Sequence, residues 1–128
     1  LYADGALGSR GAALWQPYTD DKSTAGLMVT TKETLSDQIT EVAAKGFQVN
    51  THAIGDKANR IVLDEYARVL QGKNDRRFRV EHAQVISLPD FQKFADNNVI
   101  ASVQATHATS DMRWAEKRLG PDRVMGAY

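Results

Sequence analysis

The stretch that decides the fold is residues 47–56, FQVNTHAIGD. Phe47 and Val49 give residues 47–52 the apolar character of a short β-strand, which ends at His52. Asp56 is of a residue type that caps helix N-termini, and a helical apolar stripe follows it over residues 57–71. The stretch therefore predicts a strand that turns sharply into a helix, with a histidine at the carboxyl end of the strand.

The pattern recurs along the chain. Upstream, apolar residues at helical spacing predict a helix over residues 32–45, with Thr30 and Glu33 as a capping box and Gly46 at its end. Downstream, the sequence predicts strands at 78–82 and 100–104, a helix that opens at 87–90 and ends at 97–98, and a short helix at 111–119 stopped by Gly120 and Pro121. Alternating strands and helices predict an α/β fold built from βα units around a parallel sheet.

Composition limits the classes of partner. The 128 residues form one domain's worth of chain or less, and 16 basic residues balance 16 acidic ones. Neither nucleic acid nor a membrane is therefore expected as a partner, and no apolar run is long enough to span a bilayer. The absence of cysteine excludes disulfides and fits a reducing compartment, so we expect a cytoplasmic protein. The first residue is Leu1 rather than methionine, and we expect residues 1–128 to be one piece of a longer protein.

Each of the three histidines lies at or just beyond the end of a predicted strand. In a parallel sheet these ends share one edge, where α/β enzymes bind ligands. A lone histidine there is more often a structural or surface residue, whereas three at equivalent positions favour a site. Imidazole is the commonest protein ligand for zinc, and His52 and His82 on neighbouring strands could share one ion. Catalytic zinc usually takes three protein ligands, so this pair is an incomplete set.

The glycine-rich stretch at residues 4–12 matches neither the dinucleotide fingerprint nor the phosphate-binding P-loop. It is either a loop at the rim of a site, with Arg10 offering its guanidinium to a substrate, or an irregular surface turn with a solvated arginine. Asp4 and Arg10 are candidate substrate-binding residues. Glu81 should point to the opposite face of its strand from His82, so it is a less favoured partner of the metal.

An ordered set of motifs resembles amidohydrolase family 3, the YtcJ-like metal-dependent hydrolases. The motifs are DGALGSRGAA at 4–13, HAIGD at 52–56, RVEHAQ at 79–84, ASVQATH at 101–107, Trp114 with Ala115, and RLG at 118–120. The resemblance implies part of a (β/α)8 TIM-type barrel, at about strands four to seven.

The resemblance also implies metal ligands. His52 takes the role of the strand-five histidine and His82 that of the strand-six histidine, while His107 matches a position near the substrate. The family's lysine is expected directly before Leu1, and its His-x-His pair and strand-eight aspartate have no counterpart here. Ala105 stands where relatives often carry proline.

In the family, one or two divalent ions, most often zinc, activate a water that attacks an amide-type carbonyl of a small molecule. The resemblance thus implies hydrolysis of carbon–nitrogen bonds by the intact protein, and we expect residues 1–128 alone to be inactive. Because half a barrel leaves open strand edges, we expect this chain to self-associate.

Two other functions fit less of the sequence. A non-catalytic α/β domain could keep the histidines as a binding or structural feature. A flavodoxin-like domain with a phosphate cradle is disfavoured, because no strand precedes Asp4 and no phosphate motif is present.

Overall fold

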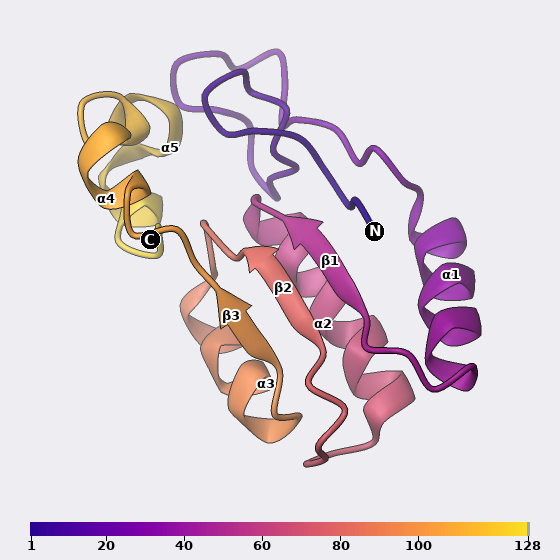
Figure 1. Ribbon diagram of the computed structural model, residues 1–128. Helices are drawn as coiled ribbons and strands as arrows, with labels where there is room; N and C mark the ends of the chain where they lie inside the picture. Colours follow the sequence, from indigo (N-terminus) through magenta and orange to yellow (C-terminus); the bar gives the residue numbers. More distant parts are fainter. Residues whose placement is uncertain (128) are drawn as a thin grey trace.

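The computed structural model describes residues 1–127, in which a small parallel sheet is backed by helices on one face (Figure 1). In chain order the elements are α1 Lys32–Ala44, β1 Asn50–Ala53, α2 Asp56–Leu70, β2 Arg79–His82, the 3-10 turn η1 Leu88–Asp90, α3 Phe91–Asp96, β3 Ile100–Ser102, α4 His107–Ser110 and α5 Ala115–Val124. The alternation confirms the predicted α/β class. The loop that follows residues 1–3, together with α4 and α5, lies beyond the carboxyl ends of the strands.

The strands run in the order β1-β2-β3, and both pairs are parallel. Residues 1–3 extend the sheet beyond β1. The His52 N–H donates to the Leu1 carbonyl at 2.9 Å, the Ala3 N–H donates to the His52 carbonyl at 2.9 Å, and Tyr2 forms a parallel bridge with His52. The start of the chain therefore lies along β1 as a further short parallel segment.

The main core lies between the sheet and the helices α1 and α2. Tyr66 of α2 is fully buried, and its hydroxyl lies 2.8 Å from Thr51 Oγ1 and 2.9 Å from the Arg79 carbonyl. Its ring packs edge-on against Phe78, with centroids 5.0 Å apart. One side chain thus joins α2 to both β1 and β2.

A second core lies over the carboxyl ends of the strands. Leu7, Leu14 and Tyr18 from the N-terminal loop pack with Ile54 and Leu119. This cluster packs α5 against the loop at residues 1–30, and together they cover the carboxyl ends of the strands.

An arginine also fastens α5 to the loop. Arg123 donates to the backbone carbonyls of Gln16 at 3.0 Å and Pro17 at 2.9 Å. Within residues 1–127, no helix combines the length and the apolar character needed to cross a bilayer.

Several predicted boundaries were wrong. β1 begins at Asn50 rather than Phe47, because Gly46 turns the chain at φ 81° and the Phe47 N–H still bonds back to the Val42 carbonyl. β3 ends at Ser102 rather than residue 104, because the chain turns into α4. The last helix starts at Ala115 rather than residue 111. Its predicted stop at Gly120 is confirmed, because Gly120 has the non-helical angles φ 80° and ψ 168°, and α5 resumes beyond this kink to Val124.

The predicted caps also differ by one residue. Thr31, not Thr30, caps α1, and its side chain accepts from the Thr34 N–H. Gly55, not Asp56, is the N-cap of α2. Asp56 is the first helical residue, and its Oδ1 accepts from the backbone N–H groups of Trp15 at 3.1 Å and Lys57 at 2.8 Å.

Gly55 allows the N-terminal loop to approach the start of α2. A Cβ at this position would lie 2.0 Å from the backbone carbonyl oxygen of Ala13. We predict that Gly55→Ala lowers the free energy of unfolding by at least about 2 kcal/mol, because this contact cannot relax by a side-chain movement. Urea unfolding followed by circular dichroism measures the loss.

Gly46→Ala is the matched control. Gly46 has a positive φ of 81°, and no heavy atom of residues 1–127 lies within 4 Å of the place that a Cβ would take, so only backbone strain of about 1 kcal/mol is expected. Equal losses for the two variants would contradict the close approach.

Candidate metal centre

The three histidines come together at the carboxyl ends of the strands. The ring centroids of His52 and His82 are 4.6 Å apart, and those of His82 and His107 are 6.2 Å apart. His52 lies on β1, His82 ends β2, and His107 begins α4 after β3. The parallel sheet therefore gathers residues that are far apart in sequence into one cluster.

The backbone reverses the direction expected for His82. In the β1–β2 register Ala53 lies opposite His82, and Ala53 is fully buried. A regular strand would aim His82 to the same buried face. His82 and Ala83 instead have φ values of 72° and 46°, a left-handed conformation that non-glycine residues rarely adopt and that clusters at functional sites.

Because of this reversal, His82 and Glu81 line the same cavity. The cavity, about 440 Å³, is lined by Leu1, Tyr2, Asn50, His52, Glu81, His82 and Gln104. The expectation that Glu81 points away from His82 was wrong, because it assumed that strand alternation continues through His82. Glu81 is held by Arg79, whose Nε lies 2.8 Å from its carboxylate. Burial acts to raise the pKa of Glu81, but bonds from Ser102 and Arg79 outweigh it, and the pKa is lowered.

Gln104 orients the imidazole of His82. The Gln104 Oε1 lies 2.6 Å from His82 Nδ1. An amide oxygen only accepts, so Nδ1 carries a proton, and in the neutral ring Nε2 keeps its lone pair. Metal-binding histidines commonly donate their second ring nitrogen to a carbonyl or carboxylate in this way. Gln104 was not predicted as a site residue, although it ends the strand predicted at 100–104 and so belongs to the same edge as the histidines.

His52 has an unsatisfied nitrogen. Its Nε2 is buried without a hydrogen-bond partner among residues 1–127, and it lies 3.5 Å from Asp4 Oδ1. A buried polar atom without a partner is uncommon in native proteins and calls for an explanation, such as an absent ion or water. A bound metal ion beside this ring is one such explanation.

Asp4 is enclosed and bonded to backbone. Its Oδ2 accepts from the N–H groups of Ala13 and Gly55, both at 2.8 Å, and its Oδ1 accepts from the Ile54 N–H at 2.9 Å. The side chain has no solvent exposure. Both oxygens are thus used to join the N-terminal loop to the β1–α2 turn, and the predicted contact of Asp4 with a substrate stays a prediction.

His107 is held by a carboxylate that was not predicted. Its Nδ1 lies 2.9 Å from Asp111 Oδ2, which also accepts from Gln84 Nε2 at 2.7 Å. Burial acts to raise the pKa of Asp111, but bonds from Ser110, Gln84 and His107 outweigh it and lower the pKa. A carboxylate only accepts, so the proton of neutral His107 sits on Nδ1 and Nε2 is an acceptor. The four-residue spacing of His107 and Asp111, one helical turn, could have indicated this pair.

Arg10 is directed at a neighbouring carboxylate. Its Nε and Nη2 lie 3.2 Å and 3.1 Å from the two oxygens of Asp20, and the bond to Asp20 raises the pKa of Arg10. Arg118 also bonds Asp20 and, through its Nε, the Gly8 carbonyl. The structure does not bring Arg10 into the histidine cluster, and its contact with a substrate remains a prediction.

The residues present fit part of a metal site. Within residues 1–127, no group of three or more His, Cys, Asp or Glu side chains is arranged to hold an ion. The adjacent rings of His52 and His82, one oriented by Gln104 and the other with an orphaned nitrogen, suit two imidazole ligands of a metal such as zinc.

Sequence comparison identifies the family. The model of the amidohydrolase family (Amidohydro_3) matches residues 1–128. The chain belongs to the amidohydrolase family. It is 40% identical over 126 residues to LONG AFTER FAR-RED 3 of Arabidopsis thaliana, covering 97% of this chain and 22% of that protein. It is 40% identical over 128 residues to YtcJ of Bacillus subtilis (strain 168), which carries the name of an amidohydrolase, covering 100% of this chain and 24% of YtcJ.

Solved structures of the fold agree with this assignment. An uncharacterized metal-dependent hydrolase from Pyrococcus furiosus superimposes with a TM-score of 0.88 at 33% identity, covering 99% of this chain and 26% of that chain. One from Pyrococcus horikoshii OT3 gives a TM-score of 0.87 at 35% identity, covering 99% of this chain and 25% of that chain. This amidohydrolase chain thus spans about a quarter of the length of its relatives.

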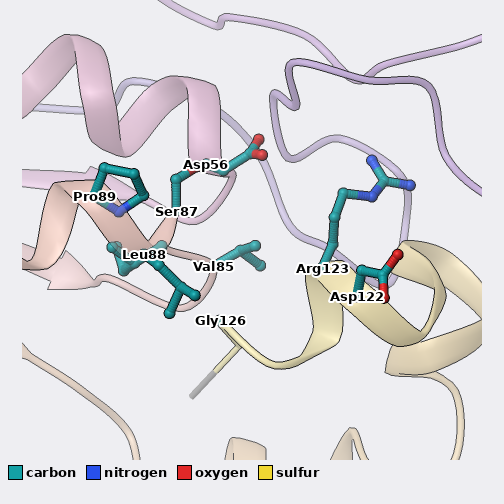
Figure 2. A pocket seen from close by; sticks show the side chains of 9 residues that line it. Asp56, Val85, Ser87, Leu88, Pro89, Asp122, Arg123 and Gly126 are labelled. Atoms are coloured by element: carbon teal, nitrogen blue, oxygen red, sulfur yellow. The ribbon is translucent and has the colours of Figure 1, made fainter.

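A separate hollow lies at the start of α2 (Figure 2). It measures about 300 Å³, and Asp56, the segment from Val85 to Pro89, Asp122, Arg123 and Gly126 line it. Burial raises the pKa of Asp56, although backbone N–H groups of Trp15 and Lys57 oppose the rise. Arg123 directs its donors to backbone carbonyls of Leu119, Gln16 and Pro17. Asp56 and Arg123 are therefore engaged in bonds to the backbone, most of them to the N-terminal loop.

We predict that Asp4→Asn lowers the free energy of unfolding of this amidohydrolase chain by about 3 kcal/mol. The amide nitrogen of asparagine cannot accept, so at least one of the buried N–H groups now bonded to Asp4 is left unsatisfied, beside the loss of charge. Urea unfolding measures the change. Asp37→Asn, at an exposed position on α1, is the control and should change stability by less than about 0.5 kcal/mol. A small effect of Asp4→Asn would contradict the structural role of the carboxylate.

Proposed function

We propose that this chain is part of the catalytic barrel of a metal-dependent amidohydrolase that hydrolyses carbon–nitrogen bonds of small amides. The observation that carries the proposal is the His52–His82 pair, with rings 4.6 Å apart at the carboxyl edge of a parallel sheet. Membership of the amidohydrolase family and the likeness to metal-dependent hydrolases from Pyrococcus support it.

The strand arrangement supports a place within a (β/α)8 barrel. The segment at residues 1–3 together with β1, β2 and β3 makes four neighbouring parallel segments. We assign them to about strands four to seven, so that His52 lies near the end of strand five and His82 ends strand six. Enzymes of this fold keep their catalytic groups at the carboxyl ends of the strands, where the three histidines lie.

In this proposal His52 and His82 hold a divalent metal, most suitably zinc. Such an ion, when bound, supplies a water of lowered pKa and polarises the substrate carbonyl. Gln104 keeps the proton of His82 on Nδ1, so Nε2 is free to act as the ligand. We place the remaining ligands on other parts of a longer protein, so residues 1–128 alone would be inactive.

The other candidate residues take roles in substrate binding. His107, with Nδ1–H held by Asp111, offers Nε2 as an acceptor for an N–H of the amide. Arg10 and Asp4 shape the loop above the strands, and Arg10 is the candidate for binding a polar group of the substrate. We place the enzyme in the cytoplasm, because the chain has no cysteine.

The open edges of the sheet support self-association of residues 1–128. On β3 and just after it, Ile100 and Val103 are exposed by 38% and 56%, and apolar residues on an unpaired edge favour association. Sedimentation should therefore show dimers or larger species, and a clean monomer would contradict this part of the proposal.

Zinc calorimetry tests the metal site. We expect zinc to bind the wild-type chain, and His52→Ala and His82→Ala each to weaken the affinity by at least about tenfold, since each removes a ligand. His107→Ala, in the same cluster, is the matched control and should leave the affinity within about threefold. Equal affinities for all variants would favour the non-catalytic alternative, in which the histidines form no metal site.

Hydrolysis by a full-length protein that carries this chain tests the reaction. Acetanilide and phenyl acetate share the acyl group and differ in the bond cleaved. We expect metal-dependent cleavage of the amide, with kcat/KM reduced by at least about 100-fold in His82→Ala. Cleavage of the ester alone, or full amide hydrolysis by His82→Ala, would contradict the proposal.

A further inference from the structure

A mainly apolar cavity lies next to His107. It measures about 230 Å³, and Ala6, Leu7, Gly8, Ile54, Gln84, His107, Asp111 and Trp114 line it. Leu7 and Ile54 are buried at 1% and 4% exposure, and they belong to the second core, which covers the carboxyl ends of the strands. Packing therefore holds the walls of the cavity in place.

The polar groups of the cavity already bond to one another. Gln84 donates to Asp111 Oδ2, and His107 Nδ1 lies 2.9 Å from the same oxygen. A charged or strongly polar group placed there would lose water and find few partners. The cavity therefore favours an apolar group.

The position of the cavity relates it to the metal ligands. The ring of His82 is 4.6 Å from that of His52 on one side and 6.2 Å from that of His107 on the other. His107 lines the apolar cavity, whereas His52 and His82 line the polar one. The apolar cavity is therefore related to the metal ligands through His107, whose ring is the neighbour of the His82 ring.

We propose that this cavity receives an apolar substituent of the substrate, so that the substrates are amides that carry a benzyl-sized or branched aliphatic group. The inference rests on the function proposed above for the histidines. The volume of the apolar cavity, about 230 Å³, exceeds the roughly 150 Å³ of an apolar protein cavity that takes up benzene. Trp114 supplies an aromatic wall on which a planar group could pack.

Binding to the metal-free chain tests the cavity directly. In a Trp15→Phe background, fluorescence reports Trp114 alone, because the chain has two tryptophans. We expect saturable quenching by N-benzylacetamide and none by N-methylacetamide at the same concentrations. Absence of saturable quenching by N-benzylacetamide, or equal quenching by both amides, would overturn the inference.

Gly8 offers a matched pair of variants. A Cβ on Gly8 would lie 3.4 Å from the Trp114 ring, so Gly8→Ala adds only an ordinary contact, whereas Gly8→Leu carries its side chain into the cavity. We expect Gly8→Leu to weaken binding of N-benzylacetamide by at least about tenfold and Gly8→Ala by less than about threefold. Unchanged binding by a folded Gly8→Leu variant would overturn the inference. If Gly8→Leu does not fold, nuclear Overhauser contacts between the benzyl protons and the Trp114 indole in the wild type decide: their presence supports the cavity and their absence refutes it.

The two proposals can fail separately. If N-benzylacetamide binds at Trp114 but zinc does not bind and no amide is cleaved, the cavity stands and the hydrolase function falls. If the full-length protein cleaves amides but its kcat/KM is no higher for N-benzylacetamide than for N-methylacetamide, the hydrolase function stands and the cavity proposal falls.

Discussion

The buried carboxylate of Asp4 is the contact on which the arrangement of the site depends. Three backbone N–H groups, from Ala13, Ile54 and Gly55, donate to it at 2.8–2.9 Å. A buried charge is tolerated only where such bonds replace its water, and here they also tie the N-terminal loop to the turn after β1. The same carboxylate lies 3.5 Å from His52 Nε2, so the first histidine lies beside the junction of the loop and the turn.

The second constraint is the left-handed backbone at His82 and Ala83. It breaks the alternation of β2 and turns His82 to the side of the sheet that carries His52 and Glu81. Strain of about 1–3 kcal/mol for each such residue persists only where surrounding contacts hold it. The bond from His82 Nδ1 to Gln104 and the packing of buried Ala83 are such contacts. His82, which would otherwise face the helices, thus joins the histidine cluster at the carboxyl ends of the strands.

Much of this arrangement could be predicted from the sequence. Local signals identified α1, α2, α3 and α5, the short strands and the order of βα units, because apolar periodicity and turn residues act within a few positions, whereas the four-residue α4 was not predicted. They also placed the three histidines at strand ends, and the structure shows their rings to be neighbours. What local signals could not supply depends on contacts across the fold. Examples are the reversal at His82, the bond from His82 to Gln104, the Asp111 partner of His107 and the enclosure of Asp4, whose partners lie 9 to 51 residues away. Asp56 was predicted as a cap on residue type alone, whereas the close approach of Ala13 makes Gly55 the cap.

The central claim is that His52 and His82 act together as metal ligands and that His107 does not. Long-range proton–nitrogen correlation spectra of the nitrogen-15-labelled chain, recorded during titration with zinc, test it most directly because each imidazole nitrogen is observed separately. We predict that His82 starts with its proton on Nδ1. We further predict that ring nitrogens of His52 and His82 then shift together with one affinity, while those of His107 stay unchanged. Zinc-induced shifts confined to His107, or no shift at His52 and His82 at saturating zinc, would contradict the claim.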